Sequence, residues 1–455
     1  MTSFDRFSVD QALAQVVRRY CQHRLKLAFS GGLDSTVLLS GLAAQRQQHD
    51  FELIALHVNH GWTDSAVGWE AHCRAFCQSL GVPFVSVHFG DQRTVTLNRE
   101  EVARRRRLRW FCSQLEQGDI LLTAHHRDDQ AETILYRLLR GAGVRGLGAM
   151  AVETRLGKAR VVRPLIDLSR DEIAAYAAAR GLSFIEDPSN QDTGLDRNYI
   201  RHTVMPLLEQ RWPGATTTLA RAAGHLRQAQ SLLAEVGSED LARCGRPVVG
   251  NVFKVLGSLG IPQLRDFSKA RQANLLRHWI MGADLLLPSK AALEELLRQL
   301  AVTGPDTAAA LCWGAAEIRQ YRDLLYLLPP QALQASPIGR SWDPSEDALV
   351  PETGVRVHAR TRMGQGLKLS MLEGKALELR WVRGQATIRP GPGRSRRSVK
   401  NLLQEAAVPP WERWRLPLVY HHGQLVCVPG VAIAAELWTG SDEPGLEILV
   451  TDLAC

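Results

Sequence analysis

Long apolar runs are missing from this 455-residue sequence, because no stretch of about 18 consecutive apolar residues occurs in it. The opening residues, MTSFDRFSVD, carry acidic side chains and lack the apolar segment of a secretory signal peptide. We therefore expect neither a membrane span nor a membrane partner.

Cysteine is also scarce, with eight residues in the whole chain and no CxxC pair. Such sparse thiols are typical of a reducing compartment, so we expect a cytoplasmic protein without a disulfide framework. Cys73 and Cys77 stand four residues apart on an expected helix. A shared metal ion is one interpretation of this pair, and buried thiols on a helix face are the one that we favour.

A Walker loop is absent too, since GxxxxGK[ST] does not occur. This absence disfavours a kinase or a motor ATPase that acts on the γ-phosphate of ATP. Acidic residues are outnumbered by basic ones, and the formal net charge is +8. A basic balance favours a polyanionic partner, of which nucleic acid is the usual one.

What the sequence does contain, between residues 25 and 124, is an alternation of short apolar runs and helical patterns. The runs are LKLAF, FELIALHV, PFVSVHF and DILLTAH, which begin at Leu25, Phe51, Pro83 and Asp119. Strands that alternate with helices in this way form a parallel sheet covered on both faces. We therefore expect an α/β fold with a doubly wound, mostly parallel sheet.

The rest of the chain changes character twice. A long helical pattern runs from Ala215 to Cys244, and the turn-rich stretch from Leu327 to Gly354 precedes a tail of short β-like runs. We expect a catalytic domain (1–215), a helical middle domain (216–330), a linker (331–365) and a small α+β C-terminal domain (366–455).

The stretch SGGLDS, residues 30–35, joins an expected strand to an expected helix. Gly31 and Gly32 allow positive φ and a close approach of the backbone to a ligand. Successive N–H groups in such a turn bind an anion, and the helix N-terminus adds partial positive charge. Asp34 repels phosphates unless a cation lies between them, so it suggests Mg²⁺. A plain turn with Asp34 as N-cap is the alternative.

Polar side chains also follow two later strands, where parallel sheets bind ligands. They are His57, Asn59 and His60 after the second strand, and His125 and His126 after the fourth, ahead of Asp129 and Glu132. Asp129 and Glu132 are three apart, so they share a helix face. For Asp128 and Asp129 the alternative is an N-cap and a first-turn acid of the following helix. For His125 and His126 the alternative is a pair of hydrogen-bonded strand-end histidines.

A formal GxGxxG runs from Gly141 to Gly146 in RGAGVRGLG. It follows a helical pattern instead of a strand, so the context of a dinucleotide-binding fingerprint is lacking. We interpret it as a flexible loop near the site.

SGGLDS resembles the phosphate loop of the PP-loop ATP pyrophosphatases, which cleave ATP between its α and β phosphates. HHRDDQAET and EDPSNQDTGLDRNYIRH resemble the tRNA(Ile)-lysidine synthetases, and the likeness covers most of residues 25–215. The resemblance implies ATP-dependent ligation of free L-lysine to C2 of the wobble cytidine of a tRNA(Ile) with a CAU anticodon. It also implies an adenylated cytidine intermediate and the release of AMP and pyrophosphate. A monomer and a homodimer both stay open.

The resemblance implies site residues as well. ATP binding falls to Ser30, Gly31, Gly32, Leu33, Asp34, Ser35, His57, Asn59 and His60, and Mg²⁺ to Asp34. Catalytic roles fall to Asp34, Arg104, Asp129 and Glu132, and the last two carboxylates also suit the lysine ammonium. Arg104 and Arg107 match the family pattern ExxARxxR, and cationic donors suit charge that develops on the α-phosphate. Leu108 and Trp62 depart from the family's usual Tyr and Leu, which affects packing or tRNA contact but not the chemistry.

Binding of tRNA is expected at Arg197 and Arg201 and at Arg394, Arg396, Arg397 and Lys400. The last four lie in a tail that resembles the C-terminal domain of the longer lysidine synthetases, which grips the tRNA. Basic side chains ahead of a helix suit a phosphate backbone, and a basic surface loop is the alternative. We interpret Trp411 and Trp414 as core residues.

Three rival functions fit the sequence less well. A tRNA thiolase usually carries paired cysteines, and none form a CxxC here. An amide-forming synthetase that uses glutamine needs a glutaminase domain, and none is evident. A tRNA-binding protein with a relic ATP loop is disfavoured by the intact Ser30, Asp34 and Ser35.

Overall fold

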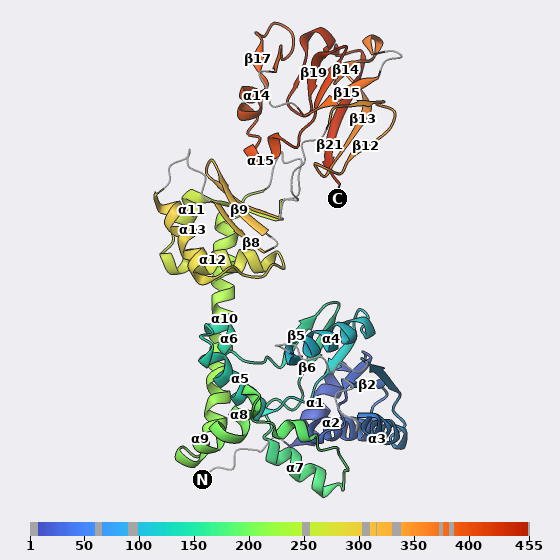
Figure 1. Ribbon diagram of the computed structural model, residues 1–455, viewed down its shortest axis with the longest axis vertical. Helices are drawn as coiled ribbons and strands as arrows, with labels where there is room; N and C mark the ends of the chain where they lie inside the picture. Colours follow the sequence, from blue (N-terminus) through green and yellow to red (C-terminus); the bar gives the residue numbers. More distant parts are fainter. Residues whose placement is uncertain are drawn as a thin grey trace. The chain divides into compact units, whose positions relative to one another are not determined.

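The computed structural model describes residues 8–59, 66–89, 99–247, 255–302, 310–314, 316–329, 338–372, 376–381 and 386–453. The chain forms two compact units, Met1–Leu232 and Leu233–Cys455 (Figure 1). Within the described ranges, no helix is both long enough and apolar enough to cross a membrane.

The first unit is built on a six-stranded sheet with the order β3-β2-β1-β4-β6-β5. Its strands are β1 (Leu25–Ala28), β2 (Leu53–Asn59), β3 (Phe84–His88), β4 (Ile120–Leu122), β5 (Glu153–Leu156) and β6 (Ala159–Val162). All neighbouring strands pair in parallel except β5, which is antiparallel to β6 at one edge. The expected α/β fold is confirmed. The strand order reverses between β1 and β4, where open sheets of this kind bind ligands.

Helices cover both faces of this sheet (Figure 1). The face with the larger core packs against α1 (Val9–Tyr20), α2 (Leu33–Gln45), α3 (Ala66–Ser79) and α7 (Arg170–Ala179). The opposite face packs against α4 (Arg99–Gln114), whose Phe111 contacts a small cluster with Leu56, Leu121 and Val161. The sheet is therefore buried between two helical layers, as its near-continuous apolar strands require.

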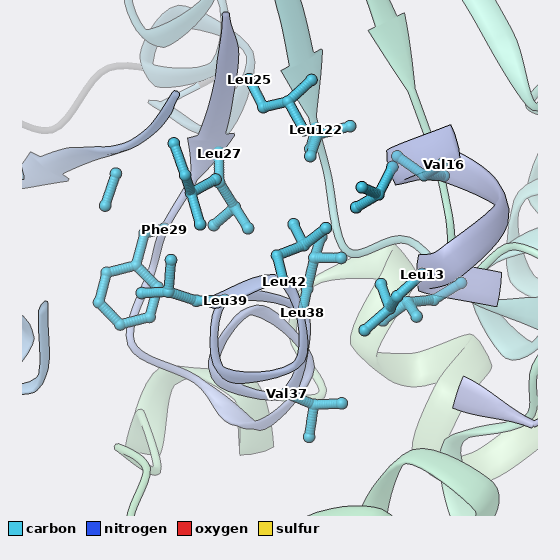
Figure 2. Close-up of a cluster of buried hydrophobic side chains, with 14 of the residues drawn as sticks. Leu13, Val16, Leu25, Leu27, Phe29, Val37, Leu38, Leu39, Leu42 and Leu122 are labelled. Carbon is cyan, nitrogen blue, oxygen red and sulfur yellow. The ribbon is translucent and has the colours of Figure 1, made fainter. Parts of the chain in front are cut away.

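Helix α2 is buried nearly all round, because its sequence LDSTVLLSGLAAQ places apolar or small residues on every face. Figure 2 shows Leu38, Leu39 and Leu42 of α2 beside Leu25 and Leu27 of β1. Leu38 is fully buried, and truncation of such a leucine to alanine costs about 2–5 kcal/mol of stability. This packing holds the start of α2, and with it the loop that precedes the helix, in one position.

Cys73 and Cys77 of α3 belong to the same core and are fully buried. Burial raises the pKa of each thiol to about 12, so both stay protonated. Among the residues that the structure describes, no group of three or more ligating side chains could hold a metal ion. The interpretation of these cysteines as buried helix-face thiols is confirmed.

The remaining helices of the first unit follow β4 in the chain. They are α5 (Arg127–Leu139), α6 (Val144–Leu147), α8 (Asp196–Tyr199), α9 (Met205–Arg211), the 3₁₀ turn η1 (Pro188–Gln191) and the π-helical turn η2 (Ile200–Val204). Helix α10 spans Ala215–Cys244, the segment for which the sequence predicted a long helix. A capping box between Ser169 and Glu172 begins α7.

The middle region contains helices and a small sheet. Its helices are α11 (Ile261–Arg265), α12 (Lys269–Gly282) and α13 (Lys290–Val302), and its strands are β7 (Gly257–Gly260), β8 (Ala310–Trp313), β9 (Ala316–Tyr321) and β10 (Leu324–Leu328). The helical middle region is confirmed. The antiparallel sheet, with the order β7-β10-β9-β8, adds to it. A short apolar run such as LLYLL fits a helix as well as a strand, so periodicity did not reveal this sheet.

The C-terminal region is α+β, as expected. Its strands are β11 (Arg340–Trp342), β12 (Ala348–Val350), β13 (Val355–Met363), β14 (Leu367–Lys368), β15 (Leu377–Arg380), β16 (Thr387–Ile388), β17 (Arg397–Ser398), β18 (Leu418–His421), β19 (Gln424–Val428), β20 (Ala432–Ile433) and β21 (Pro444–Asp452). Its helices are α14 (Val399–Glu405) and α15 (Pro410–Arg413), with the 3₁₀ turns η3 (Leu369–Met371) and η4 (Ala435–Leu437).

Strands β11, β12 and β13 lie within residues 331–365, where the sequence predicted a linker. Turn-forming residues between short strands have the same composition as a linker, which explains the difference. The domain boundaries themselves stay a prediction. Trp411 is 6% exposed and packs against the rings of Tyr321 and Tyr326, so it is a core residue; Trp414 is partly buried.

Candidate active site

The loop of residues 30–35 lies at the carboxyl end of β1, at the switch point of the sheet. The backbone N–H of Ser30 donates to Ser35 Oγ at 3.3 Å, and Ser35 Oγ donates to the carbonyl oxygen of Gly32 at 3.0 Å. Gly32 is the N-cap of α2 and provides no side-chain cap. The first-turn N–H groups of α2, from Leu33 onward, are therefore suited to bind an anion.

Of the two glycines in this loop, Gly31 is the one that the backbone requires. Its φ is +83°, and a Cβ atom there would lie 2.5 Å from Cys73 Sγ and 2.8 Å from Ile185 Cδ1. Its carbonyl oxygen accepts hydrogen bonds from Ile185 N–H (2.8 Å) and from the hydroxyl of Thr36 (3.2 Å). At Gly32, by contrast, φ is −74° and a Cβ atom would meet Ser30 Oγ at an ordinary 3.5 Å.

We expect Gly31→Ala to weaken ATP binding about tenfold or more, because left-handed strain costs about 1–3 kcal/mol and the Cβ atom also displaces the loop. Gly32→Ala is the matched control and should change the dissociation constant for ATP by about twofold at most. Calorimetric titration with ATP, together with the melting temperature of each variant, checks this. Equal losses in the two variants would contradict the assignment.

His57 and Asn59 lie on β2, beside β1, and are 5% and 4% exposed. Burial lowers the pKa of His57, and in the neutral ring Nδ1 donates to the carbonyl oxygen of Phe29 at 2.9 Å. Asn59 Nδ2 donates to a carboxylate oxygen of Glu70 on α3 at 3.1 Å. These contacts brace the strand ends next to the loop, and the ATP-binding role of both residues stays a prediction. His60 and Trp62 lie outside the described residues.

His126 connects the loop to helix α5. It is 2% exposed and is the N-cap of α5. Its Nε2 lies 3.7 Å from Asp34 Oδ2 and 3.5 Å from Asp129 Oδ2, and its Nδ1 lies 3.5 Å from Asp128 Oδ2. Three carboxylates from two helices therefore surround one imidazole.

These groups shift one another's protonation. Burial alone would lower the pKa of His126, but the carboxylates of Asp128, Asp129 and Asp34 raise it above its ordinary value. Burial raises the pKa of Asp34, whose Oδ1 is buried without a hydrogen-bond partner. Burial opposes ionisation of Asp129 as well, but His126 and nearby guanidiniums hold its pKa below the usual range.

The carboxylates of Asp129 and Glu132 also meet two arginines. Arg201 Nε and Nη2 donate to Glu132 at 2.6 and 2.9 Å, and Nη2 is 3.0 Å from Asp129 Oδ1. Arg197 donates to Asp129 at 3.1 Å and to Glu132 at 3.2 Å. We call these four residues the carboxylate–arginine cluster. Residues predicted to bind lysine and residues predicted to bind tRNA thus form one network.

The segment EDPSNQDTGLDRNYIRH is folded so that its two arginines reach this network. Asn198 Nδ2 donates to the carbonyl oxygen of Asp192 at 3.0 Å, and His202 Nε2 lies 2.8 Å from the carbonyl oxygen of Asn190. The π-helical turn η2 contains Arg201 and lies between α8 and α9. A π-helical turn is rare and often occurs at functional sites, because it changes the direction of side chains within a helix.

Arg104 and Arg107 lie on exposed positions of α4. Burial and, to a smaller extent, the charges of Arg163, Arg197 and Arg107 together lower the pKa of His125 to about 4, against the opposing charge of Asp129. His125 is therefore neutral at pH 7, and Arg107 is near enough to act on the carboxyl end of β4. Burial lowers the pKa of Arg137 on α5, and the charge of Arg104 contributes to this shift. The catalytic role of Arg104 stays a prediction.

The GxGxxG segment follows α5 and contains α6, so the absence of a preceding strand is confirmed. Arg137 donates to the carbonyl oxygens of Gly146 (2.8 Å) and Ala149 (3.0 Å). Arg227 of α10 donates to the carbonyl oxygen of Gly148 at 2.8 Å. The segment is therefore tied to two helices, where the sequence predicted a flexible loop.

The basic residues of the C-terminal region lie around the N-terminus of α14. Arg394, Arg396 and Lys400 are exposed, and Arg397 forms an ion pair with Glu405. Arg389 Nε donates to the carbonyl oxygen of Arg394 at 3.0 Å, which shapes the loop. The three exposed cations form a surface that suits a phosphate backbone.

The first unit thus brings together the predicted loop, Asp34 and the carboxylate–arginine cluster at the carboxyl end of the parallel strands. His126 is the site residue to which sequence reasoning assigns no role, although the sequence places it at the end of the fourth strand. The spacing His126–Asp129 of a helix N-cap and its third residue was the available signal. The proximity of His126 to Asp34 had no sequence signal, because it joins residues 92 positions apart.

Three family models match the chain. A PP-loop domain matches residues 6–208, a TilS substrate binding domain matches 259–326, and a TilS substrate C-terminal domain matches 377–450. Together they account for the α/β unit, the middle region and the C-terminal region.

Curated relatives match over almost the whole chain. The tRNA(Ile)-lysidine synthase of Alkalilimnicola ehrlichii is 39% identical over 411 residues, which cover 90% of this chain and 89% of that protein. The tRNA(Ile)-lysidine synthase of Pseudomonas aeruginosa is 41% identical over 416 residues, or 89% of each chain. A solved U34-tRNA thiolase from Methanococcus maripaludis is more distant, at 22% identity and a TM-score of 0.41 over 48% of this chain and 77% of that chain. That similarity is too low to bear on function.

Proposed function

We propose that the chain, which belongs to the tRNA(Ile)-lysidine synthase family, ligates free L-lysine to the wobble cytidine of a tRNA(Ile) with a CAU anticodon. The C2 oxygen of the cytidine attacks the α-phosphate of ATP, and pyrophosphate leaves. The lysine ε-amine then attacks C2, and AMP leaves with that oxygen. The tRNA then decodes isoleucine instead of methionine codons. Sparse, reduced thiols support a cytoplasmic location. A homodimer stays a prediction.

The observation that carries the proposal is that the phosphate loop, through Asp34, contacts a cluster in which carboxylates outnumber cations. Asp34, Asp128, Asp129 and Glu132 lie in one contact network with two guanidiniums and His126. Even with His126 protonated, the carboxylates outnumber the cations, so the network attracts an amine substrate. An α-phosphate held by the loop would lie beside that amine.

ATP would bind with its phosphates on the loop of residues 30–35 and the N-terminus of α2. Asp34 fits a magnesium ligand, because its Oδ1 is buried and lacks a hydrogen-bond partner that would otherwise satisfy it. When bound, Mg²⁺ neutralises charge on the phosphates and orients them. Arg104, on the exposed side of α4, would approach the α-phosphate as negative charge develops there.

Asp129 and Glu132 would recognise the lysine ammonium, while Arg197 and Arg201 hold the two carboxylates in place. Asp129 is 8% exposed and Glu132 is 2% exposed, so little water competes with this recognition. The side chain of Arg197 is 42% exposed, which leaves part of its guanidinium for a tRNA phosphate near the wobble cytidine. The side chain of Arg201 is 25% exposed and mainly orients Glu132.

The C-terminal cations would contact tRNA further from the reaction. Arg394, Arg396 and Lys400 are exposed and carry positive charge around one loop, and Arg397 helps to shape it through Glu405. Because no base-reading geometry is needed for phosphate contacts, they would contribute affinity more than sequence discrimination.

The test is incubation of the purified protein with ATP, radiolabelled lysine and a tRNA(Ile) transcript that has a CAU anticodon. We expect label in the tRNA together with one pyrophosphate for each lysine transferred. A transcript with uridine at the wobble position is the matched control and should stay unlabelled. No lysine transfer, or sulfur transfer in its place, would contradict the proposal.

A further inference from the structure

An open recess of about 380 Å³ lies beside α4, away from the carboxylate–arginine cluster. It is lined by Phe89, just after β3, and by Arg106, Arg109, Trp110 and Ser113 of α4. We call it the α4 recess. Its volume is within the range of small-ligand sites, and its lining combines two aromatic rings with two cations.

The recess and Arg104 lie on different faces of α4. Its four helical residues have the spacing i, i+3, i+4 and i+7, so they form one face of α4. Ala103 and Phe111 are buried against the sheet and form the core face. Arg104 lies on the other side of that core face, about 160° from Arg106 at 100° per residue. The recess arginines therefore differ in position from those that the family pattern ExxARxxR includes.

The two recess arginines also carry positive charge. Arg106 is half-buried and Arg109 is exposed, and no ion pair joins either guanidinium to another of the described residues. Trp110 is half-buried and packs beside the small cluster under α4, so its position is set by the fold while one part of it lines the recess. Aromatic rings beside arginines bind unstacked nucleotides, since the rings stack on bases and the guanidiniums hold phosphates.

The recess nevertheless lies only a short distance from the phosphate loop, at the same end of the sheet. Phe89 N–H donates to the carbonyl oxygen of Asn59 at 3.0 Å, so the recess adjoins the carboxyl end of β2. Strand β3 lies two strands from β1, or about 10 Å across the sheet. A polynucleotide whose reacting base reaches the phosphate loop would have neighbouring nucleotides at this distance.

We propose that the α4 recess binds one nucleotide of single-stranded RNA close to the reacting base, with its base on Trp110 and its phosphates on Arg106 and Arg109. The inference rests on the proposed function, because it takes the RNA to be the anticodon loop of the substrate tRNA. Loop bases are unstacked and available for such contacts, whereas bases of a duplex are not. The net charge of +8 favours this partner over a protein of like charge.

The experiment compares tRNA affinity and its salt dependence in three variants of the full chain. Arg106→Ala/Arg109→Ala should weaken binding about tenfold and lower the slope of log affinity against log salt by about 1.4, at about 0.7 per contact with a single strand. Trp110→Leu should weaken binding about tenfold with an unchanged slope, because stacking carries no charge. Arg18→Ala/Arg155→Ala, on α1 and β5 at exposed positions, is the charge-matched control and should stay within about twofold.

Nucleotide-resolved acylation of the tRNA 2′-hydroxyls gives the second readout. Wild-type protein should protect a short stretch of the anticodon loop, and both recess variants should lose protection at the same nucleotide while they melt within a few degrees of wild type. Turnover of lysine at saturating tRNA should stay at the wild-type level. Lysine transfer by the wild-type protein, measured in parallel, tests the proposed function independently of the recess.

Three results would overturn the recess proposal. The first is that the recess variants bind tRNA as tightly as the control variant does. The second is that tRNA affinity falls equally in the recess and control variants. The third is that the 2′-hydroxyl footprint of the recess variants is the same as that of the wild type. A variant that keeps tRNA affinity but loses self-association in sedimentation would instead assign the recess to a second copy of this chain.

Discussion

Asp34→Asn should lower ATP-dependent adenylation of the tRNA by about a thousandfold or more while it leaves tRNA affinity within about twofold. The side chain keeps its shape but can no longer neutralise a cation at its buried Oδ1. Loss of a preorganised charge at a transferring phosphoryl group has effects of this size. Pyrophosphate release in the presence of tRNA measures adenylation, and filter binding measures the affinity.

Stability gives an independent check on the same variant. Burial raises the pKa of Asp34, so its carboxylate is favourable to folding when protonated and becomes unfavourable as pH rises through the folded-state pKa. Ionised Asp34 therefore destabilises the fold, and Asp34→Asn should not lower the melting temperature. Asp171→Asn, at an exposed first-turn position of α7, is the control and should keep full adenylation. Lost tRNA binding with intact adenylation would reverse the assigned role.

Glu132→Gln should raise the KM for lysine about a hundredfold and leave adenylation of the tRNA within about threefold. The change removes a buried charge that accepts three hydrogen bonds from Arg197 and Arg201, and it leaves two guanidiniums beside the incoming ammonium. The loss of one charge from such a buried network costs about 2–5 kcal/mol. Single-turnover assays that separate pyrophosphate release from lysine transfer measure the two steps.

A matched control for this charge is available at the far edge of the same sheet. Glu153 also accepts from two arginines, Arg19 and Arg160, each at 3.1 Å. Glu153→Gln should leave the KM for lysine unchanged. If Glu132→Gln slows adenylation as much as lysine transfer, the carboxylate acts on the first step, and its assignment to lysine recognition is wrong.

Local sequence was sufficient to predict the loop. The order of apolar run, Gly-Gly and apolar helix in residues 25–42 is a property of neighbours, and the structure shows β1, the turn and α2 in that order. The pattern did not separate the glycines, because whether a Cβ atom fits at Gly31 depends on Cys73 and Ile185. Those contacts come from α3 and from the segment that follows α7.

The pairing of charges depended on long-range contacts. Arg197 and Arg201 lie more than 60 positions after Asp129 and Glu132, and nothing in the spacing indicated that these sets neutralise each other. Asp129 and Glu132 on one helix face followed from the helix period alone. Their burial followed from the packing of η2 and α8 against α5.

The sequence by itself therefore determined the α/β class, the anion-binding loop, the shared face of two acids and the basic C-terminal surface. Each of these depends on residues within about one turn of helix or one strand and loop. Only the tertiary structure decided that His126 lies beside Asp34, that two arginines hold the carboxylates, and that Trp110 lines a recess. These features join residues from different elements, and the packing of the sheet between its helical layers sets the distances between them.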